Sequence, residues 1–249
     1  VATYQDVTVS ISTSGTGTEG TDYATISDIT ISAGSTTGTS SFTPTDDSVY
    51  EGNETGIAAI SAVSGGGATE NGTQTQTITI TDNESAPTVT LSTSATTTAE
   101  NSGGSLTLTA TLSTATTANV TVSIGTSGTA SEGTDYSTIS DITISAGSTT
   151  GTTSFTPSND SSVEGNETAT VSITGVSGGS ATEDGNQSVT ITITDDDTTP
   201  TATLTTSATS IAENSGSSIS LTVTLSTADS SNVTVSFATS GTATEGTDY

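Results

Sequence analysis

A long internal repeat constrains the fold of this chain more than any other feature of its sequence. The tetrapeptide Gly-Thr-Asp-Tyr ends at Tyr23, Tyr136 and Tyr249, which are spaced by 113 residues. Residues 15–44 and 128–157 agree at 26 of 30 positions without a gap. A period of this length is the size of a whole domain, so the sequence predicts a tandem array of domains rather than a solenoid of short units.

One copy of the repeat is complete and two are partial. The repeat divides the chain into a partial domain at 1–85, a complete domain at 86–198 and a partial domain at 199–249. Because residues 1–23 align with 227–249, the first copy lacks its first two strands and the last copy stops after three. The last copy of one chain could in principle supply the strands that the first copy of another chain lacks. Residues 227–249 would then duplicate residues 1–23, and strands would be left over. We therefore expect the sequence to be an excerpt from a longer array.

Apolar residues alternate with Ser and Thr throughout the complete copy, as in Leu106, Leu108, Ala110 and Leu112. A period of two in segments rich in β-branched residues is typical of half-buried strands. Turn signals separate about seven such segments: 87–98, 104–113, 119–127, 139–145, 150–156, 166–175 and 188–195. The sequence therefore predicts an all-β fold of tandem immunoglobulin-like antiparallel sandwiches.

Composition leaves one alternative to a folded array. Val, Ile, Leu and Phe make up roughly 17% of the chain, and a fraction below about 20% together with high charge is typical of disorder. A solvated Ser/Thr-rich tether is thus the competing interpretation. The regular alternation of the few apolar residues favours the folded one.

The charge of the chain restricts its partners. There are 27 acidic side chains and no Lys, Arg or His, which gives a formal net charge of −27. Nucleic acid and anionic membrane surfaces would repel such a chain, so neither is expected as a partner. No apolar run is long enough to span a bilayer, so direct membrane insertion of this segment is not expected.

The missing residue types also argue against catalysis. Without His, Cys, Lys or Arg, the usual triads, thiol nucleophiles and phosphate clamps cannot be built. Paired carboxylates could hydrolyse glycosides, but few aromatic residues are present to hold a sugar. We expect that the chain is not an enzyme.

The acids of the complete copy are expected to gather at one end of its sandwich. Successive antiparallel strands reverse direction, so alternate loops lie at the same end. Nine of its twelve acids fall at the end where the first strand finishes: Glu100, Glu132, Asp135, Asp160, Glu164, Glu167, Asp195, Asp196 and Asp197. A salt-adapted surface would spread acids over the strands instead, and ordinary acidic turns are the other alternative.

Two loops concentrate this charge, at 45–54 and 158–167, and both contain Glu-Gly-Asn-Glu. Like charges a few ångströms apart repel one another, and no positive side chain is present to pair with them. A cation from solution is required, and an all-oxygen set of hard ligands favours Ca²⁺.

The order of these motifs resembles the Calx-β domain. The motifs are Glu100, Gly-Thr-Ala-x-x-Gly-x-Asp-Tyr ending at Tyr136, Asp-x-x-x-Glu-Gly-Asn-Glu ending at Glu167, and Asp-Asp-Asp ending at Asp197. Calx-β domains are known from sodium–calcium exchangers, an integrin subunit and very large bacterial surface proteins. The near-identical tandem copies are most similar to the repeats of large bacterial adhesins.

The resemblance implies a Ca²⁺-binding sandwich and a set of ligands in each copy. In the complete copy these are Glu100, Asp135, Asp160, Glu164, Glu167, Asp195, Asp196 and Asp197. In the first copy they are Asp22, Asp46, Asp47, Glu51, Glu54, Asp82 and Glu84, and in the last copy Glu213 and Asp248. Asn159 and Asn83 stand where the neighbouring copy has Asp46 and Asp196, and the first copy has no equivalent of Glu100. The two sites should therefore differ in affinity or ion count.

Two functions fit these expectations. One is a structural repeat of a long extracellular or cell-surface protein, an adhesin stalk or filament protomer stiffened by Ca²⁺ at its domain junctions. Its partners would be neighbouring repeats and identical chains in a filament, and the ligand at its tip is left open. The alternative is a Ca²⁺-sensing regulatory domain pair of a larger membrane or signalling protein. Extracellular modules bind Ca²⁺ at about 10⁻⁴–10⁻³ M and sensors at about 10⁻⁷–10⁻⁵ M, so affinity separates the two.

Overall fold

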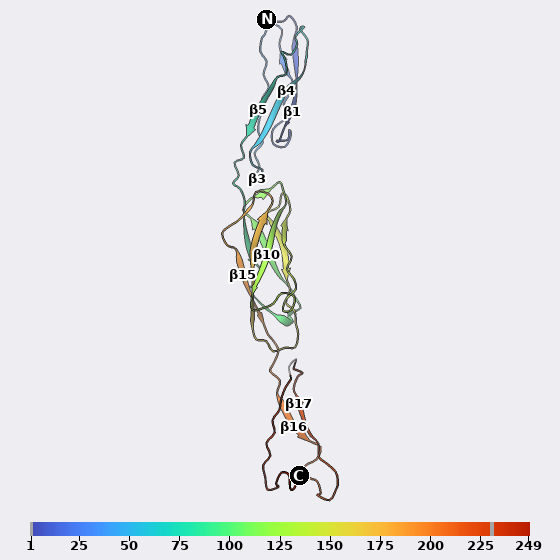
Figure 1. The fold of residues 1–249 in the computed structure, drawn as a ribbon. Coiled ribbons are helices and arrows are strands. Elements are labelled where there is room, and N and C mark those ends of the chain that lie inside the picture. Colours follow the sequence, from blue (N-terminus) through green and yellow to red (C-terminus); the bar gives the residue numbers. More distant parts are fainter. Residues whose placement is uncertain (1, 230–231) are drawn as a thin grey trace.

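The computed structural model describes residues 2–229 and 232–249 of the chain. Three β-rich units follow one another along an elongated molecule, and the two termini lie at opposite ends (Figure 1). The described residues form strands and one short 3-10 turn, η1 (Glu100–Ser102), but no α-helix. Among them, no helix is long and apolar enough to cross a membrane.

The middle unit is a complete sandwich of two sheets. Its strands are β6 (Thr88–Thr93), β7 (Thr97–Ala99), β8 (Leu106–Leu112), β10 (Val120–Gly128), β11 (Ile142–Ile144), β12 (Thr150–Phe155), β13 (Glu167–Ser177), β14 (Thr182–Glu183) and β15 (Ser188–Thr194). One sheet has the order β11-β10-β13-β15-β7 and the other β12-β8-β6-β14. The predicted all-β sandwich is confirmed.

The apolar residue of each alternating pair faces the interior between the two sheets. Leu108, Val120, Val122 and Ile142 are all fully buried, while the Ser and Thr residues next to them in the strands are half-buried or exposed. The largest pair in this core is Tyr136 and Phe155, whose rings stack with centroids 4.8 Å apart and an interplanar angle of 25°. A small but continuous core therefore holds the sandwich together despite the low apolar content of the chain.

The expected strand segments all contain strands, with one difference. The first expected segment, 87–98, is two strands: β6 pairs antiparallel with β8, whereas β7 crosses to the other sheet and pairs parallel with β15. β14 likewise pairs parallel with β6, so the sandwich is not purely antiparallel as predicted. Thr93 and Ala95, between β6 and β7, are joined by a hydroxyl-to-carbonyl hydrogen bond of 2.9 Å that turns the chain from one sheet to the other.

The first unit contains one four-stranded sheet among its described residues. Its order is β2-β1-β4-β5, and the strands are β1 (Val7–Gly15), β2 (Ile29–Ile31), β4 (Glu54–Ser64) and β5 (Thr75–Ile80). Shifted by the 113-residue repeat, these match β10, β11, β13 and β15 of the middle unit. The sheet that covers them in the middle unit has no counterpart in residues 2–85.

The third unit contains two antiparallel strands, β16 (Ala202–Thr206) and β17 (Leu221–Leu225). They match β6 and β8 in position and in register. The repeat also predicts a third strand near 232–240, but these residues form none. In the middle unit the counterpart of this segment is β10, which pairs with β11 and β13.

A short parallel bridge connects the first and middle units. Residues of β3 (Val49–Tyr50) lie in the acidic loop of the first unit, and they pair with β9 (Ala115–Thr116) of the middle unit. Thr116 is 2% exposed, its carbonyl accepts the N–H of Gly147 at 2.8 Å, and its hydroxyl donates to the carbonyl of Ala118 at 2.6 Å. The acidic loop thus contacts a buried, hydrogen-bonded part of the next domain.

Candidate metal centre

Six carboxylates of the middle domain form two neighbouring triads at one end of the sandwich. One triad is Asp135, Glu164 and Glu167, and the other is Glu100, Asp160 and Asp197. Within each triad one oxygen of every carboxylate lies within 4.8 Å of the others. Members of both triads line a cavity of about 10 Å³ between them, which is too small for an organic ligand.

The first triad joins two loops. Asp135 lies in the turn before the buried Tyr136, where its Oδ2 accepts the N–H of Ser131 at 2.5 Å. Glu164 comes from the loop between β12 and β13, and Glu167 is the first residue of β13. The stacked Tyr136 and Phe155 fix the positions from which the turn and the loop emerge, so the core places these carboxylates together.

The second triad contains the most buried carboxylate of the chain. Glu100 begins the η1 turn after β7, and only 7% of this carboxylic residue is exposed. Its Oε1 and the Oδ2 of Asp197 are buried without a hydrogen-bond partner. A buried carboxylate oxygen without a partner is costly unless a cation or proton satisfies it. These two orphaned oxygens therefore fit a bound cation.

Asp195 lies between the triads and holds the acidic loop by hydrogen bonds. Its Oδ2 accepts the N–H groups of Glu164 and Gly165 at 2.9 and 2.6 Å, and its Oδ1 accepts the N–H of Asp197 at 2.9 Å. The N–H of Asp195 in turn donates to Oδ1 of Asn166 at 3.3 Å. Asp195 thus positions one member of each triad, Glu164 and Asp197.

The electrostatics divide the acids into two kinds. Burial raises the pKa of Glu100 to about 7, and the charges of Asp195 and Asp197 add to the effect. Burial followed by the charge of Asp160 raises the pKa of Glu164, and burial followed by the charge of Asp135 raises that of Glu167. The N–H groups of Gly165 and Asp197 lower the pKa of Asp195 instead. The loop therefore holds an ionised Asp195 beside carboxylates that resist ionisation without a cation.

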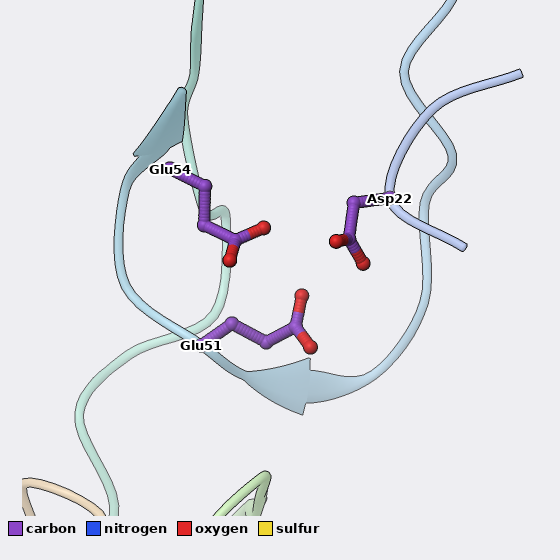
Figure 2. Close-up of side chains that lie close together, drawn as sticks. All are labelled: Asp22, Glu51 and Glu54. Atoms are coloured by element: carbon purple, nitrogen blue, oxygen red, sulfur yellow. The ribbon is translucent and has the colours of Figure 1, made fainter. Parts of the chain in front are cut away.

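The first domain repeats the first triad. Asp22, Glu51 and Glu54 point their carboxylates toward one another across the loop (Figure 2). Asp82 fills the role of Asp195, because its Oδ2 accepts the N–H groups of Glu51 and Gly52 at 2.8 and 2.6 Å. Desolvation opposes ionisation of Asp82, but these bonds and one from the N–H of Glu84 outweigh it and lower its pKa. Desolvation and then the charge of Asp22 raise the pKa of Glu51 and of Glu54.

The described residues of the first domain supply two of the three members of the second triad. Asp47 and Glu84 occupy the positions of Asp160 and Asp197, and Asp47 accepts the N–H of Val49 at 2.7 Å. No described residue of the first domain stands in place of Glu100. Asp46 is exposed in the same loop. The cavity lined by Asp47, Glu84 and the triad measures about 40 Å³, larger than its counterpart in the middle domain.

The remaining candidate ligands are less tightly grouped. Asp196 is exposed and accepts a hydrogen bond from Nδ2 of Asn101. In the third domain Asp248 accepts the N–H of Thr244 at 2.7 Å, as Asp135 does from Ser131, and Glu213 is exposed. Glu213 and Asp248 both line one wide cavity, but these two alone make no triad.

Glu132, which the topology places at the same end, has a structural role. Its two carboxylate oxygens accept the N–H of Ile139 at 2.9 Å and the hydroxyl of Thr126 at 2.8 Å. The family motif does not include Glu132, and the structure accounts for its charge without a metal.

Replacement of Asp195 by alanine tests whether its hydrogen bonds to the acidic loop support cation binding. Alanine cannot accept the hydrogen bonds that Asp195 accepts from three N–H groups, so Glu164 and Asp197 should be held less firmly. We therefore expect the Ca²⁺ affinity of the middle domain to fall about tenfold or more. Titration calorimetry measures the change. The charge-matched control is Asp184→Ala, because Asp184 follows β14 at the other end of the sandwich. An equal loss in the two variants would show that only net charge matters.

The junction contact escaped the sequence-based reasoning. Val49 and Tyr50 stand in the acidic loop among candidate ligands, and nothing in the repeat marks them as contacts of the next domain. The only available signal is that Val49-Tyr50 is an apolar pair in an otherwise polar loop, which predicts that it packs against something.

Comparison with known proteins agrees with the motifs. A family model described as the Calx-beta domain matches residues 2–84, 82–197 and 195–249, which together span nearly the whole chain. A comparison with curated protein sequences found no match.

Solved structures give partial similarities. The apo-form Calx CBD1 domain is 21% identical with a TM-score of 0.38, and the alignment covers 44% of this chain and 99% of that one. CBD12 from CALX1.2 is 15% identical with a TM-score of 0.35, covering 78% and 88%. The calcium binding domain CBD12 of CALX1.1 is 14% identical with a TM-score of 0.33, covering 76% and 87%.

Proposed function

The chain belongs to the Calx-beta domain family, and from this premise we propose that it is a structural Ca²⁺-binding segment of a long extracellular surface protein. It would serve as an adhesin stalk or as a filament protomer. Calx-beta domains are non-catalytic binding domains that bind Ca²⁺. In this chain the two triads of the middle domain and the triad of the first domain would hold the ions.

One observation carries the proposal: carboxylates from loops far apart in sequence meet without any positive side chain near them. Glu100 and Asp197 are 97 residues apart, and each buries an oxygen that has no partner. A hard divalent cation satisfies such oxygens and cancels the repulsion among the acids. Carboxylate-only ligands suit Ca²⁺ better than the nitrogen- and sulfur-preferring transition metals.

The position of the triads supports a role in stiffening. Asp195–Asp197 end the middle domain, and Thr198, Thr199 and Pro200 lead into the next one. A cation held by Asp197, Glu100 and Asp160 would fasten the root of this linker to two loops of the domain before it. At the preceding junction, the loop that carries Glu51 also carries Val49 and Tyr50, which pair with Ala115 and Thr116 of the next domain. An ordered loop would therefore favour an ordered junction.

Charge and repetition support the extracellular structural role over the sensor. A chain with a formal charge of −27 and near-identical copies suits a repeated spacer that is filled at the millimolar Ca²⁺ of extracellular fluid. A sensor needs a much tighter site of about 10⁻⁷–10⁻⁵ M. The regulatory domain pair remains the second candidate because the same triads could serve it.

The experiment is removal and restoration of Ca²⁺ on the whole chain. A site filled at a hundred times its dissociation constant adds about 2.7 kcal/mol to the free energy of unfolding. EDTA should therefore lower the melting temperature by several degrees, and small-angle X-ray scattering should show a changed maximum dimension as the junctions loosen. Excess Ca²⁺ should reverse both effects.

Mg²⁺ at equal ionic strength is the control, because simple screening of the acids would be produced equally by both ions. Unchanged melting and unchanged dimensions in EDTA would refute the proposal. A dissociation constant near 10⁻⁶ M would favour the sensor instead.

A further inference from the structure

The turn between β4 and β5 of the first domain contains the only Asn-Gly pair of the sequence, Asn71-Gly72. Both residues are exposed. Gly72 has a φ of +67°, and a Cβ added to it would meet no atom within 4 Å. The backbone that follows Asn71 is therefore open to solvent, and no side chain hinders its rotation.

The hydrogen bonds of this turn do not engage the nitrogen of Gly72. The carbonyl of Asn71 accepts Nε2 of Gln74 at 2.7 Å, and the N–H of Gln74 donates to Oε1 of Glu70 at 2.9 Å. Among the residues that the structure describes, no hydrogen bond holds the N–H of Gly72. This nitrogen is the nucleophile when an asparagine side chain cyclises onto its own backbone, and here it need not leave a partner first.

The complete middle domain has the same open turn between β14 and β15. Asp184 and Gly185 stand at the counterpart positions, and both are exposed. Gly185 has a φ of +66°, and a Cβ added to it would also meet no atom within 4 Å. Gln187 repeats the bond of Gln74, with its Nε2 2.5 Å from the carbonyl of Asp184. The exposure is therefore a property of the turn and does not depend on which strands accompany the first domain.

We propose that Asn71 is a site of spontaneous deamidation through a cyclic imide. The nitrogen of Gly72 attacks Cγ of Asn71, the bond between Cγ and Nδ2 breaks, and ammonia leaves with the proton of the Gly72 nitrogen. Water then opens the ring at either of its two carbonyls. One opening gives aspartate with an ordinary backbone, and the other gives isoaspartate, whose main chain passes through the former side chain. In either case water is consumed and an amide is exchanged for a carboxylate.

The glycine that follows distinguishes Asn71 from other asparagines. Asn83 is also exposed, but it precedes Glu84. A side chain on the following residue crowds the attack of its nitrogen, and a nearby carboxylate disfavours the loss of the proton from that nitrogen. Asn119 is held in addition by its own side chain, because its Oδ1 accepts the N–H of Ala146 at 2.9 Å.

The two products have different consequences for the turn. The aspartate product places at position 71 the residue type that the middle domain has as Asp184, and it adds one negative charge to the formal net charge of −27. The isoaspartate product lengthens the main chain by one methylene group, which displaces the carbonyl that Gln74 bonds. We expect the hydrogen bond between Gln74 and this carbonyl to be lost.

Peptide mapping of the full chain after prolonged incubation at mildly alkaline pH tests the site. The chain has no Lys or Arg, so a protease that cleaves after glutamate is used, and cleavage at Glu70 and Glu84 gives one peptide that contains both Asn71 and Asn83. We expect the mass of this peptide to rise by the difference between an amide and a carboxylic acid. Fragmentation should place the change at Asn71 and leave Asn83 intact.

Variants connect the reaction to the Asn-Gly pair. Asn71→Gln keeps an amide but requires a larger ring, and Gly72→Ala puts a methyl group beside the attacking nitrogen, so both should suppress the conversion. Thr73→Ala leaves the reacting groups in place and should convert at the wild-type rate. Circular dichroism checks that each variant keeps the fold. An isoaspartyl methyltransferase should label the aged wild type and label aged Asn71→Gln far less.

The outcome is independent of the proposed function, because the turn lies at the opposite end of β4 from Glu54. A chain that binds no Ca²⁺ should still deamidate at Asn71, in EDTA as in Ca²⁺. An Asn71 amide that survives as long as that of Asn83 would overturn the proposal. Conversion of Asn71 in urea but not in the folded chain would overturn it as well, since the folded turn would then protect the residue.

Discussion

Replacement of Phe155 by alanine is expected to lower the free energy of unfolding of the middle domain by about 3–5 kcal/mol. Phe155 is fully enclosed between the two sheets and stacks on Tyr136 at 4.8 Å. Truncation removes this contact and leaves a cavity that a small, closely packed core cannot fill. Urea denaturation in excess Ca²⁺, followed by circular dichroism, measures the loss.

The repeat provides a matched control at the same position. Phe42 stacks on Tyr23 at 4.6 Å in almost the same geometry, but the open sheet leaves it half-buried. Because water already reaches one side of Phe42, its truncation creates no closed cavity, and Phe42→Ala should cost clearly less. Equal losses in the two variants would contradict the difference in enclosure that the structure describes.

The strands of the middle domain could be predicted because the chain uses so few residue types. With Ser and Thr at nearly every outward position, each apolar residue marks the inward face, as in Leu106–Leu112 and Val120–Gly128. The split of the first strand could not be predicted. β6 and β7 lie on opposite sheets, yet Thr88–Ala99 keeps an almost even alternation of types through the switch, so periodicity carries no trace of it.

The strand topology predicts that the acids lie at one end of the sandwich, but it does not predict which of them are hydrogen-bonded and which are not. Alternation of strand direction brings Glu100, Asp135 and Asp160 to one end whatever their side-chain contacts. The difference between Asp195, bonded to three N–H groups, and Glu100, with an orphaned oxygen, depends on the loop conformation. Both are acids next to a strand end. Sequence spacing alone cannot distinguish an acid that holds the loop by hydrogen bonds from one that is free to bind a cation.

Replacement of Glu100 by glutamine is expected to have opposite effects with and without Ca²⁺. In Ca²⁺ the variant loses one charged ligand of the second triad, and we expect affinity at that site to fall on the order of 100-fold. Without Ca²⁺ the variant removes a buried charge that faces Asp160, Asp195 and Asp197. The ion-free variant should therefore melt at a higher temperature than the ion-free wild type at pH 8.

The raised pKa of Glu100 also predicts the direction in which the stability of the ion-free chain changes with pH. Burial raises the pKa of Glu100 from its ordinary value to about 7 in the ion-free fold, so between about pH 4.5 and pH 7 the folded state holds more protons than the unfolded state. Stability of the ion-free chain must then fall as pH rises through this window. The raised pKa values of Glu164, Glu167 and Asp197 act in the same direction, and the lowered pKa of Asp195 opposes them only at lower pH.

Melting curves from pH 5 to pH 8 in EDTA and in Ca²⁺ check the prediction. In EDTA the wild type should lose stability with rising pH, and Glu100→Gln should flatten the curve. In Ca²⁺ the wild type should gain stability over the same range, because the ion binds the deprotonated carboxylates. Asp184→Gln, at the opposite end of the sandwich, should follow the wild type in both. A wild-type curve that rises with pH in EDTA would mean that Glu100 is ionised in the ion-free fold, and that no cation is needed to hold it there.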